Sequence, residues 1–164
     1  LNSQAPPSPQ VLFDLKVSLA PPTPPTEPSI TATSGRRPLP MPGHDTLPYD
    51  VLYFVPQSQI AFTTQPDGIR KGSVEFDIID FNTDNRPVAS VGEILPIVLT
   101  PAEYPQFLRT PFKFYQRLTL PPGPAYLHVA VLDTVSGKVG SIDIHFTVPS
   151  KPPTPTLTSE EKPH

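Results

Sequence analysis

Two histidines occupy positions from which they could act on a ligand together. His128 and His145 each fall on the polar side of an alternating segment in the C-terminal third of the chain. If these segments are neighbouring strands, the two imidazoles stand side by side and could hold a metal ion or move a proton. A catalytic metal site usually needs about three protein ligands, so two surface histidines on a solvated face is the better interpretation.

Oxygen ligands suitable for a hard cation gather around one expected turn. Asp77, Asp80, Asp84 and Asn85 lie close together in the sequence, and calcium prefers carboxylate and carbonyl oxygens. Their spacing does not match a calcium-binding helix–loop–helix, and turn chemistry alone explains the Asp and Asn at its tip. We therefore expect no metal ion and no cofactor, with calcium at this turn as the alternative.

The sequence offers no residue arrangement for nucleophilic catalysis. Ser136, Gly137 and Ser141 lack the sharp strand-to-helix turn and the partner base that activate a serine. The glycines are scattered through turns and form no phosphate-binding loop. Cysteine is absent, so thiolate chemistry and disulfides are excluded. We expect no catalytic residue and no enzymatic activity.

Aromatic residues offer a different kind of site, a platform for carbohydrate. Phe112, Phe114 and Phe146 follow the period of their strands and are expected in the core. Tyr115 and Tyr126 have the opposite phase and are expected at the surface. An exposed pair of tyrosines would make the protein a ligand-binding module.

The bulk composition excludes several classes of function. The chain has 164 residues, 16% of them charged, and a net charge of -3, which provides no basic field for nucleic acid. No apolar run approaches the ~20 residues needed to span a bilayer. The chain begins with Leu1, and no signal sequence follows. We therefore expect a trimmed protein, either the mature form of an exported protein or a fragment of a longer one.

Proline divides the chain into a folded middle and extended ends. Of the 27 prolines, 12 lie in residues 1–48 and 5 in residues 149–164. Proline-rich segments favour polyproline II and exclude helix. We expect residues 1–48 to form an extended arm, residues 49–148 a β-sandwich domain, and residues 149–164 a disordered or extended tail.

One segment of the arm, residues 11–19, has the alternation of a strand. Its apolar side chains share one face, while Asp14, Lys16 and Ser18 share the other. Such a strand must pair with a sheet, which could belong to its own domain, to a preceding domain, or to another chain. Its apolar residues are therefore candidate partner-binding residues: Val11, Phe13, Leu15, Val17 and Leu19.

The middle of the chain reads as about seven strands separated by turns. The expected strands are 49–55, 59–64, 72–81, 87–99 (with a bulge at Gly92), 112–120, 126–133 and 142–148. Thr100, Pro101 and Glu103 are typical of a helix start, and Pro111 limits this helix to about two turns. Strands at this spacing predict an all-β fold, an immunoglobulin/fibronectin-III-like antiparallel β-sandwich with one short helix and Pro-rich extended termini.

Several short motifs occur in an order that resembles one protein family. They are QPDG at 65–68, KGSVE at 71–75, LTPAEY at 99–104, LPPGPAYL at 120–127 and SGKVGS at 136–141. In this order they resemble the C-terminal β-rich region of the acidobacterial VWFA-related domain proteins, which are exported. The resemblance covers about residues 49–148. The A domain and its Asp-x-Ser-x-Ser motif are absent. The resemblance implies a sandwich fold in an adhesion or scaffolding context, and it assigns no functional residues.

These features together predict a non-catalytic structural or protein-interaction module of an exported bacterial protein. It would act as an accessory or scaffold subunit of a cell-surface or periplasmic assembly. Its expected partners are proteins, including further copies joined through the N-terminal arm, and not nucleic acid. The alternatives are a filament subunit that donates residues 11–19 to the next copy, and a β-sandwich that binds carbohydrate through Tyr115 and Tyr126.

Overall fold

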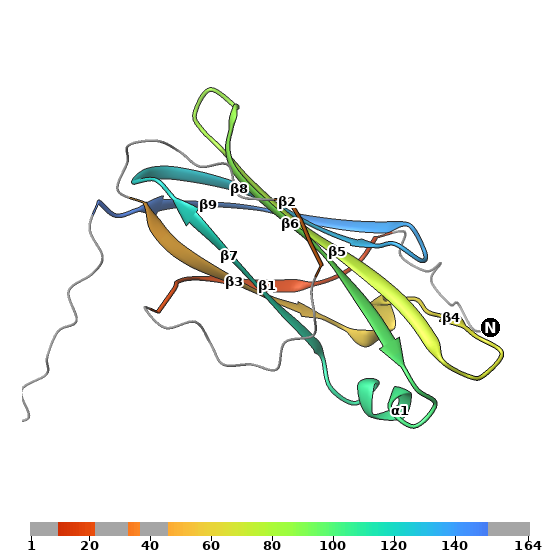
Figure 1. Ribbon diagram of the computed structural model, residues 1–164. Helices are drawn as coiled ribbons and strands as arrows, with labels where there is room; N and C mark the ends of the chain where they lie inside the picture. Colours follow the sequence, from red (N-terminus) through yellow and green to blue (C-terminus); the bar gives the residue numbers. More distant parts are fainter. Residues whose placement is uncertain (1–9, 22–32, 37–45, 151–164) are drawn as a thin grey trace, which may run out of the picture.

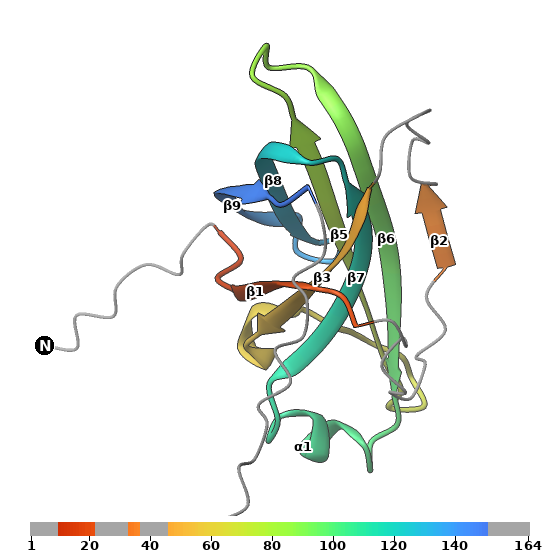
Figure 2. The ribbon, with the colours of Figure 1, turned by 90° about the vertical axis from the view of Figure 1, so that its left-hand side faces the viewer.

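The computed structural model describes residues 10–21, 33–36 and 46–150, which form two packed antiparallel β-sheets (Figure 1). The narrow sheet has the order β1-β3-β7, formed by Asp14–Leu19, Leu47–Val55 and Phe112–Leu120. The wide sheet has the order β2-β6-β5-β8-β9, formed by Thr33–Arg36, Pro87–Leu99, Arg70–Phe81, Gly123–Asp133 and Lys138–Val148, and β4 (Thr63–Thr64) pairs with β5. Figure 2 shows the narrow sheet in front of the wide one, with β2 and β9 at opposite sides.

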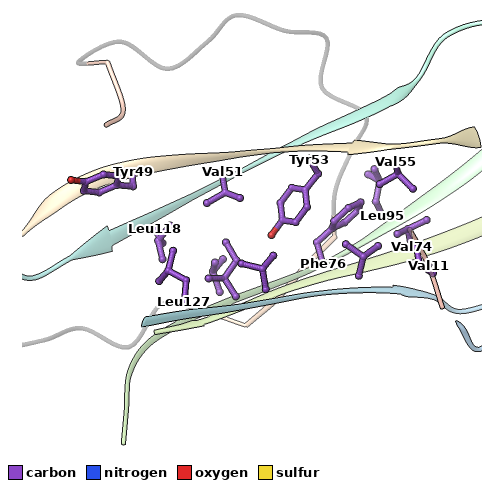
Figure 3. Close-up of a cluster of buried hydrophobic side chains, with 14 of the residues drawn as sticks. Val11, Tyr49, Val51, Tyr53, Val55, Val74, Phe76, Leu95, Leu118 and Leu127 are labelled. Carbon is purple, nitrogen blue, oxygen red and sulfur yellow. The ribbon is translucent and has the colours of Figure 1, made fainter. Parts of the chain in front are cut away.

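The core lies between the facing surfaces of the two sheets (Figure 3). Alternate residues of β3 point inward, and Val51, Tyr53 and Val55 are fully buried against the wide sheet. The ring of Tyr53 meets the ring of Phe76 edge-on, with 4.8 Å between the ring centroids. Alternation along each strand, which the sequence showed, therefore decides which side chains enter the core.

A small polar network crosses this core. The Tyr53 hydroxyl donates to Oε1 of Gln116 at 2.5 Å, and Nε2 of Gln116 donates to the Phe76 carbonyl oxygen at 2.9 Å. Burial is the largest cause that raises the pKa of Tyr53, so the phenol stays protonated and remains a donor. The network satisfies buried polar groups and ties the two sheets together.

The sequence prediction of an all-β antiparallel sandwich with one short helix is confirmed. The finer assignment to an immunoglobulin or fibronectin-III type stays a prediction. The predictions for the arm and the tail fall largely on residues 1–9, 22–32, 37–45 and 151–164, which lie outside the described residues.

The N-terminal strand is part of the sandwich, so the folded unit is not confined to residues 49–148. β1 pairs antiparallel with β3, from Asp14 opposite Phe54 to Leu19 opposite Tyr49. β2 pairs with β6. β3 itself begins at Leu47, two residues before the expected boundary. A boundary drawn from proline content missed these pairings because partners distant in sequence leave no local signal.

The helix is shorter than expected, although its start has the expected chemistry. α1 covers Tyr104–Phe107, one turn instead of two. The Thr100 amide donates to Oε2 of Glu103 at 2.8 Å, and the Glu103 amide donates to Oγ1 of Thr100 at 3.3 Å. This is the reciprocal capping box that the sequence predicted. The hydrogen bonds from Thr100 lower the pKa of the Glu103 carboxyl.

Two strand details differ from the sequence prediction. The strand expected over 59–64 is reduced to β4, and a 3-10 turn occupies Gln57–Gln59 directly after Pro56. The bulge expected at Gly92 is absent from the pairing of β6 with β5, where Gly92 lies opposite Asp77 in continuous register. Gly92 instead faces the register shift in β2.

Candidate interaction surfaces

The two sheets approach each other closely along one side and leave the other side open. On the closed side β6 approaches β7, whereas β1 and β9 on the other side make no comparable approach. Within the described ranges, no strand pairs with the outer edge of β1 or of β9. Two rows of backbone donors and acceptors are therefore left without a sheet partner there.

An apolar slot of about 510 Å³ lies between these two strands. Its apolar residues come from the inward faces of β1, β3 and β9, and most of them are only half-buried; the exposed Asp14 of β1 adds a carboxylate at the rim. The apolar lining consists of Leu15, Val17, Tyr49, Ile142, Ile144 and Phe146. An extended segment that paired with β9 could place every second side chain in this slot.

The slot is closed at one end by the chain just before β1. Val11 is only 3% exposed, and its backbone lies against Gly140 at the start of β9. A Cβ atom on Gly140 would lie 1.9 Å from the Val11 carbonyl oxygen, so only glycine fits there. The Leu12 amide donates to Oε1 of Gln59 at 3.1 Å and fixes the same segment. The open part of β9 therefore begins beyond Gly140.

The partner-binding residues predicted in 11–19 serve the chain's own sheet in this structure. Val11 is in the core, and the other four are half-buried and packed against it: Phe13, Leu15, Val17 and Leu19. Of the three pairings that the sequence left open, the structure has the first, with β3 of the same domain. Leu15 and Val17 also line the slot.

A second hollow, of about 600 Å³, lies on the outer face of the wide sheet. It contains both of the predicted histidines, which come from β8 and β9. Nδ1 of His128 lies 2.7 Å from Oδ1 of Asp143, and the His145 ring meets the Tyr126 ring edge-on at 4.9 Å between centroids. The hairpin between β5 and β6, which projects from the end opposite α1 (Figure 1), completes its wall with Asn82, Thr83 and Asn85.

The acidic residues near this hairpin are not assembled as a cation site. Among the described residues, no group of three or more His, Asp or Glu is placed to hold a metal ion. Asp80 points inward and accepts a hydrogen bond from the Tyr126 amide at 3.0 Å, and burial raises the pKa of its carboxyl. Oδ1 of Asn82 accepts from the amides of Asp84 and Arg86, so these residues shape the turn.

The structure does not bring Tyr115 and Tyr126 together. Tyr115 faces outward from β7 in the narrow sheet, and Tyr126 faces outward from β8 in the wide sheet. Both are half-exposed, but they lie on opposite outer faces and cannot form one platform. Ser136 is also engaged: its hydroxyl donates to the buried carboxylate of Asp133 within the hairpin.

Sequence reasoning missed two features of these surfaces. Asp143 was not recognised as the partner of His128, although the two residues are directly opposite in the β8–β9 register. Phe146 was expected in the core because it follows the period of its strand, and it is only half-buried, like Ile142 and Ile144 on the same face. Only the position of β9 at the sheet edge shows that they line an open slot, and no local pattern carries that information.

Comparisons with known proteins leave the function open. No family model matches the chain, and no curated protein matches it. One similar solved structure is the ApaA protein from Bordetella pertussis, at 13% identity and a TM-score of 0.33, covering 86% of this chain and 97% of that one. Another is a β-glucosidase from Listeria innocua in complex with gluconolactone, at 13% identity and a TM-score of 0.28, covering 85% of this chain and 16% of that one. Similarity at this level supports no argument about function.

The described part of the chain contains no helix long and apolar enough to cross a membrane.

Proposed function

We propose that this protein is a non-catalytic interaction module, an accessory or scaffold subunit of an exported cell-surface or periplasmic assembly. It holds its partner along the open side of the sandwich, between β1 and β9. The observation that carries the proposal is the slot itself: two unpaired strand edges flank a row of half-buried apolar side chains. This arrangement suits an extended protein segment, because edge pairing supplies affinity and alternate pockets supply specificity.

β9 is the better of the two edges for such pairing. It pairs with β8 without a register shift from Lys138 to Val148, and it contains no proline. Natural proteins usually guard an exposed edge with a proline, a bulge or an inward-pointing charge. The inward residues of β9 between Gly140 and Val148 are apolar, namely Ile142, Ile144 and Phe146. β9 therefore lacks the usual protections and is open to strand addition.

The hydrogen bonds made by the potentially reactive side chains support a non-catalytic role. The Ser136 hydroxyl donates to the carboxylate of Asp133 within its own hairpin. The buried Tyr53 hydroxyl is used between the sheets. Placement outside the cytoplasm is supported by the resemblance to the exported VWFA-related domain proteins and remains part of the proposal.

Selection from a library of random ten-residue peptides displayed on phage tests the docking surface. Enriched peptides should carry apolar residues at every second position. A synthetic copy should slow amide exchange in β9. Phe146→Asp places a charge in the slot and should abolish binding, whereas Thr147→Asp on the exposed face of the same strand should not. Peptides without alternation, or binding that survives Phe146→Asp, would remove the proposal.

The outer-face hollow supports a second candidate, carbohydrate binding. Tyr126 offers a half-exposed ring, and polar groups surround it on the neighbouring strand and hairpin. Aromatic faces combined with carboxylate, amide and imidazole groups suit sugar C–H and hydroxyl groups. A glycan array followed by saturation-transfer NMR tests this. Tyr126→Ala should abolish the signal, and Tyr115→Ala, on the opposite outer face, is the matched control.

A further inference from the structure

The open edge of β9 has a property that identifies one partner, a second copy of this chain. Two identical strands that pair antiparallel are related by a two-fold axis, and the residues around that axis face one another. The sequence of β9 can therefore be examined for the register in which it complements itself.

One register of β9 against itself satisfies both faces of the sheet. With Ile144 opposite Ile144 of the second copy, Ile142 lies opposite Phe146 on the inner face. On the outer face Asp143 lies opposite His145, and the symmetric pair repeats this contact. Opposite charges directly across two strands stabilise a sheet, and like charges destabilise it. This register therefore joins apolar to apolar and acid to base.

Neighbouring registers are worse. Centring the pair on Asp143 puts two carboxylates opposite each other, and centring it on His145 puts two imidazoles opposite each other. Moving one strand past the other by a single residue would place inward side chains of one copy opposite outward side chains of the other. Because the inner face is buried, such a register is excluded. Centring the pair on Ile142 or on Phe146 places Asp143 opposite Ser141 or His145 opposite Thr147, so neither pairs an acid with a base. The register centred on Ile144 is the one that pairs Asp143 with His145 while keeping apolar side chains opposite one another.

We propose that β9 pairs with β9 of a second copy in the register centred on Ile144, forming a two-fold dimer with one continuous wide sheet. The slots of the two copies then meet at the dimer axis. This inference rests on the proposed docking surface and names its partner. Oδ1 of Asp143 contacts His128 within the same copy, which leaves Oδ2 for His145 of the other. An interface of one strand pair is small, so the dimer should be transient.

Single cysteines test the register directly, because the chain has no cysteine of its own. Opposed residues in antiparallel strands have Cα atoms about 4.5–5.5 Å apart, within disulfide range. In the full-length protein, Ile144→Cys should form a disulfide-linked dimer under mild oxidation. Ile142→Cys and Phe146→Cys should each remain monomeric alone and should cross-link when mixed. Equal cross-linking of all three, or none by any, would overturn the proposed dimer.

A charge swap tests the same register without a covalent bond. Asp143→Lys removes the carboxylate that faces His145, and His145→Asp places two carboxylates opposite each other. Each should weaken self-association roughly tenfold, measured by sedimentation at high concentration. The double variant Asp143→Lys/His145→Asp should restore it, and so should a mixture of the two single variants. His128→Ala removes the contact within one copy and should change nothing. Absence of restoration would refute the register.

The peptide assay separates this inference from the proposed function. If the chain stays monomeric but an alternating peptide still protects β9, the dimer is wrong and the docking surface stands. If neither a second copy of the chain nor a peptide binds β9, the dimer and the docking surface are both wrong.

Discussion

Adding one methyl group at Gly140 will show whether the N-terminal segment belongs to this domain in solution. A Cβ there would lie 1.9 Å from the carbonyl oxygen of Val11 and 3.0 Å from its carbonyl carbon. The obstructing atoms are backbone, so no side-chain rotation relieves the clash. In Gly140→Ala, Val11 must therefore leave its place on β9, while the strands of the wide sheet keep their pairing.

The size of the effect follows from what Val11 loses. Its side chain is 3% exposed, and full burial of a valine stabilises a protein by about 1.5–3 kcal/mol. Gly140→Ala should therefore lower the free energy of unfolding by about 2 kcal/mol. With a urea dependence of about 2 kcal/mol per molar, the unfolding midpoint should fall by roughly 1 M.

Urea unfolding followed by circular dichroism measures this loss, with two controls. Ser141→Ala changes the exposed outward neighbour and should leave the midpoint nearly unchanged. Val11→Ala should destabilise the parent but have little further effect in the Gly140→Ala background, because Val11 has already been displaced. Equal costs of Val11→Ala in both backgrounds would refute the reasoning. So would a Gly140→Ala variant as stable as the parent.

Three further predictions concern the core and its boundaries. Tyr53→Phe and Gln116→Leu should each cost about 1–3 kcal/mol in urea unfolding by leaving a buried polar group unpaired, and the double variant should cost less than their sum. Burial raises the pKa values of Asp80 and Glu93, so the folded state binds protons more tightly than the unfolded chain. Stability should therefore rise as pH falls from neutral into the range in which these two carboxyls take up protons, and Asp80→Asn/Glu93→Gln should flatten that rise in urea midpoints. A chain that begins at Tyr49 loses β1, β2 and the start of β3, so its amide NMR spectrum should lack the dispersion shown by a chain that begins at Gln10.

The sequence predicted well those parts of the fold that depend on residues close together in the chain. β7 runs from Phe112 to Leu120, as the alternation of its apolar residues indicated. The capping box between Thr100 and Glu103 forms as expected, because all its partners lie within four consecutive residues. The helix itself was overestimated, since a cap fixes where a turn begins and not how many turns follow.

The parts that the sequence did not predict depend on which strands become neighbours. Tyr115 and Tyr126 both have the outward phase, and that phase is what the structure has. Their strands belong to different sheets, however, so the two side chains lie on opposite outer faces of the sandwich. His128 and His145 joined adjacent strands, as the hairpin between them suggested, yet the contact that forms is with Asp143.

The same limit explains why the open side was missed and why it exists. The alternation of apolar and polar residues indicates whether a side chain points inward. How deeply that side chain is buried depends on the elements that cover it. Val129 and Ile142 both point inward from adjacent strands; Val129 is fully buried, and Ile142 is not. Among the described residues the narrow sheet has three strands and the wide sheet six, so the edge strand of the wide sheet is covered only in part. A sandwich with unequal layers must leave apolar residues uncovered at one side unless a further strand is added. In the proposed dimer that strand is β9 of the second copy, and the slot would become core.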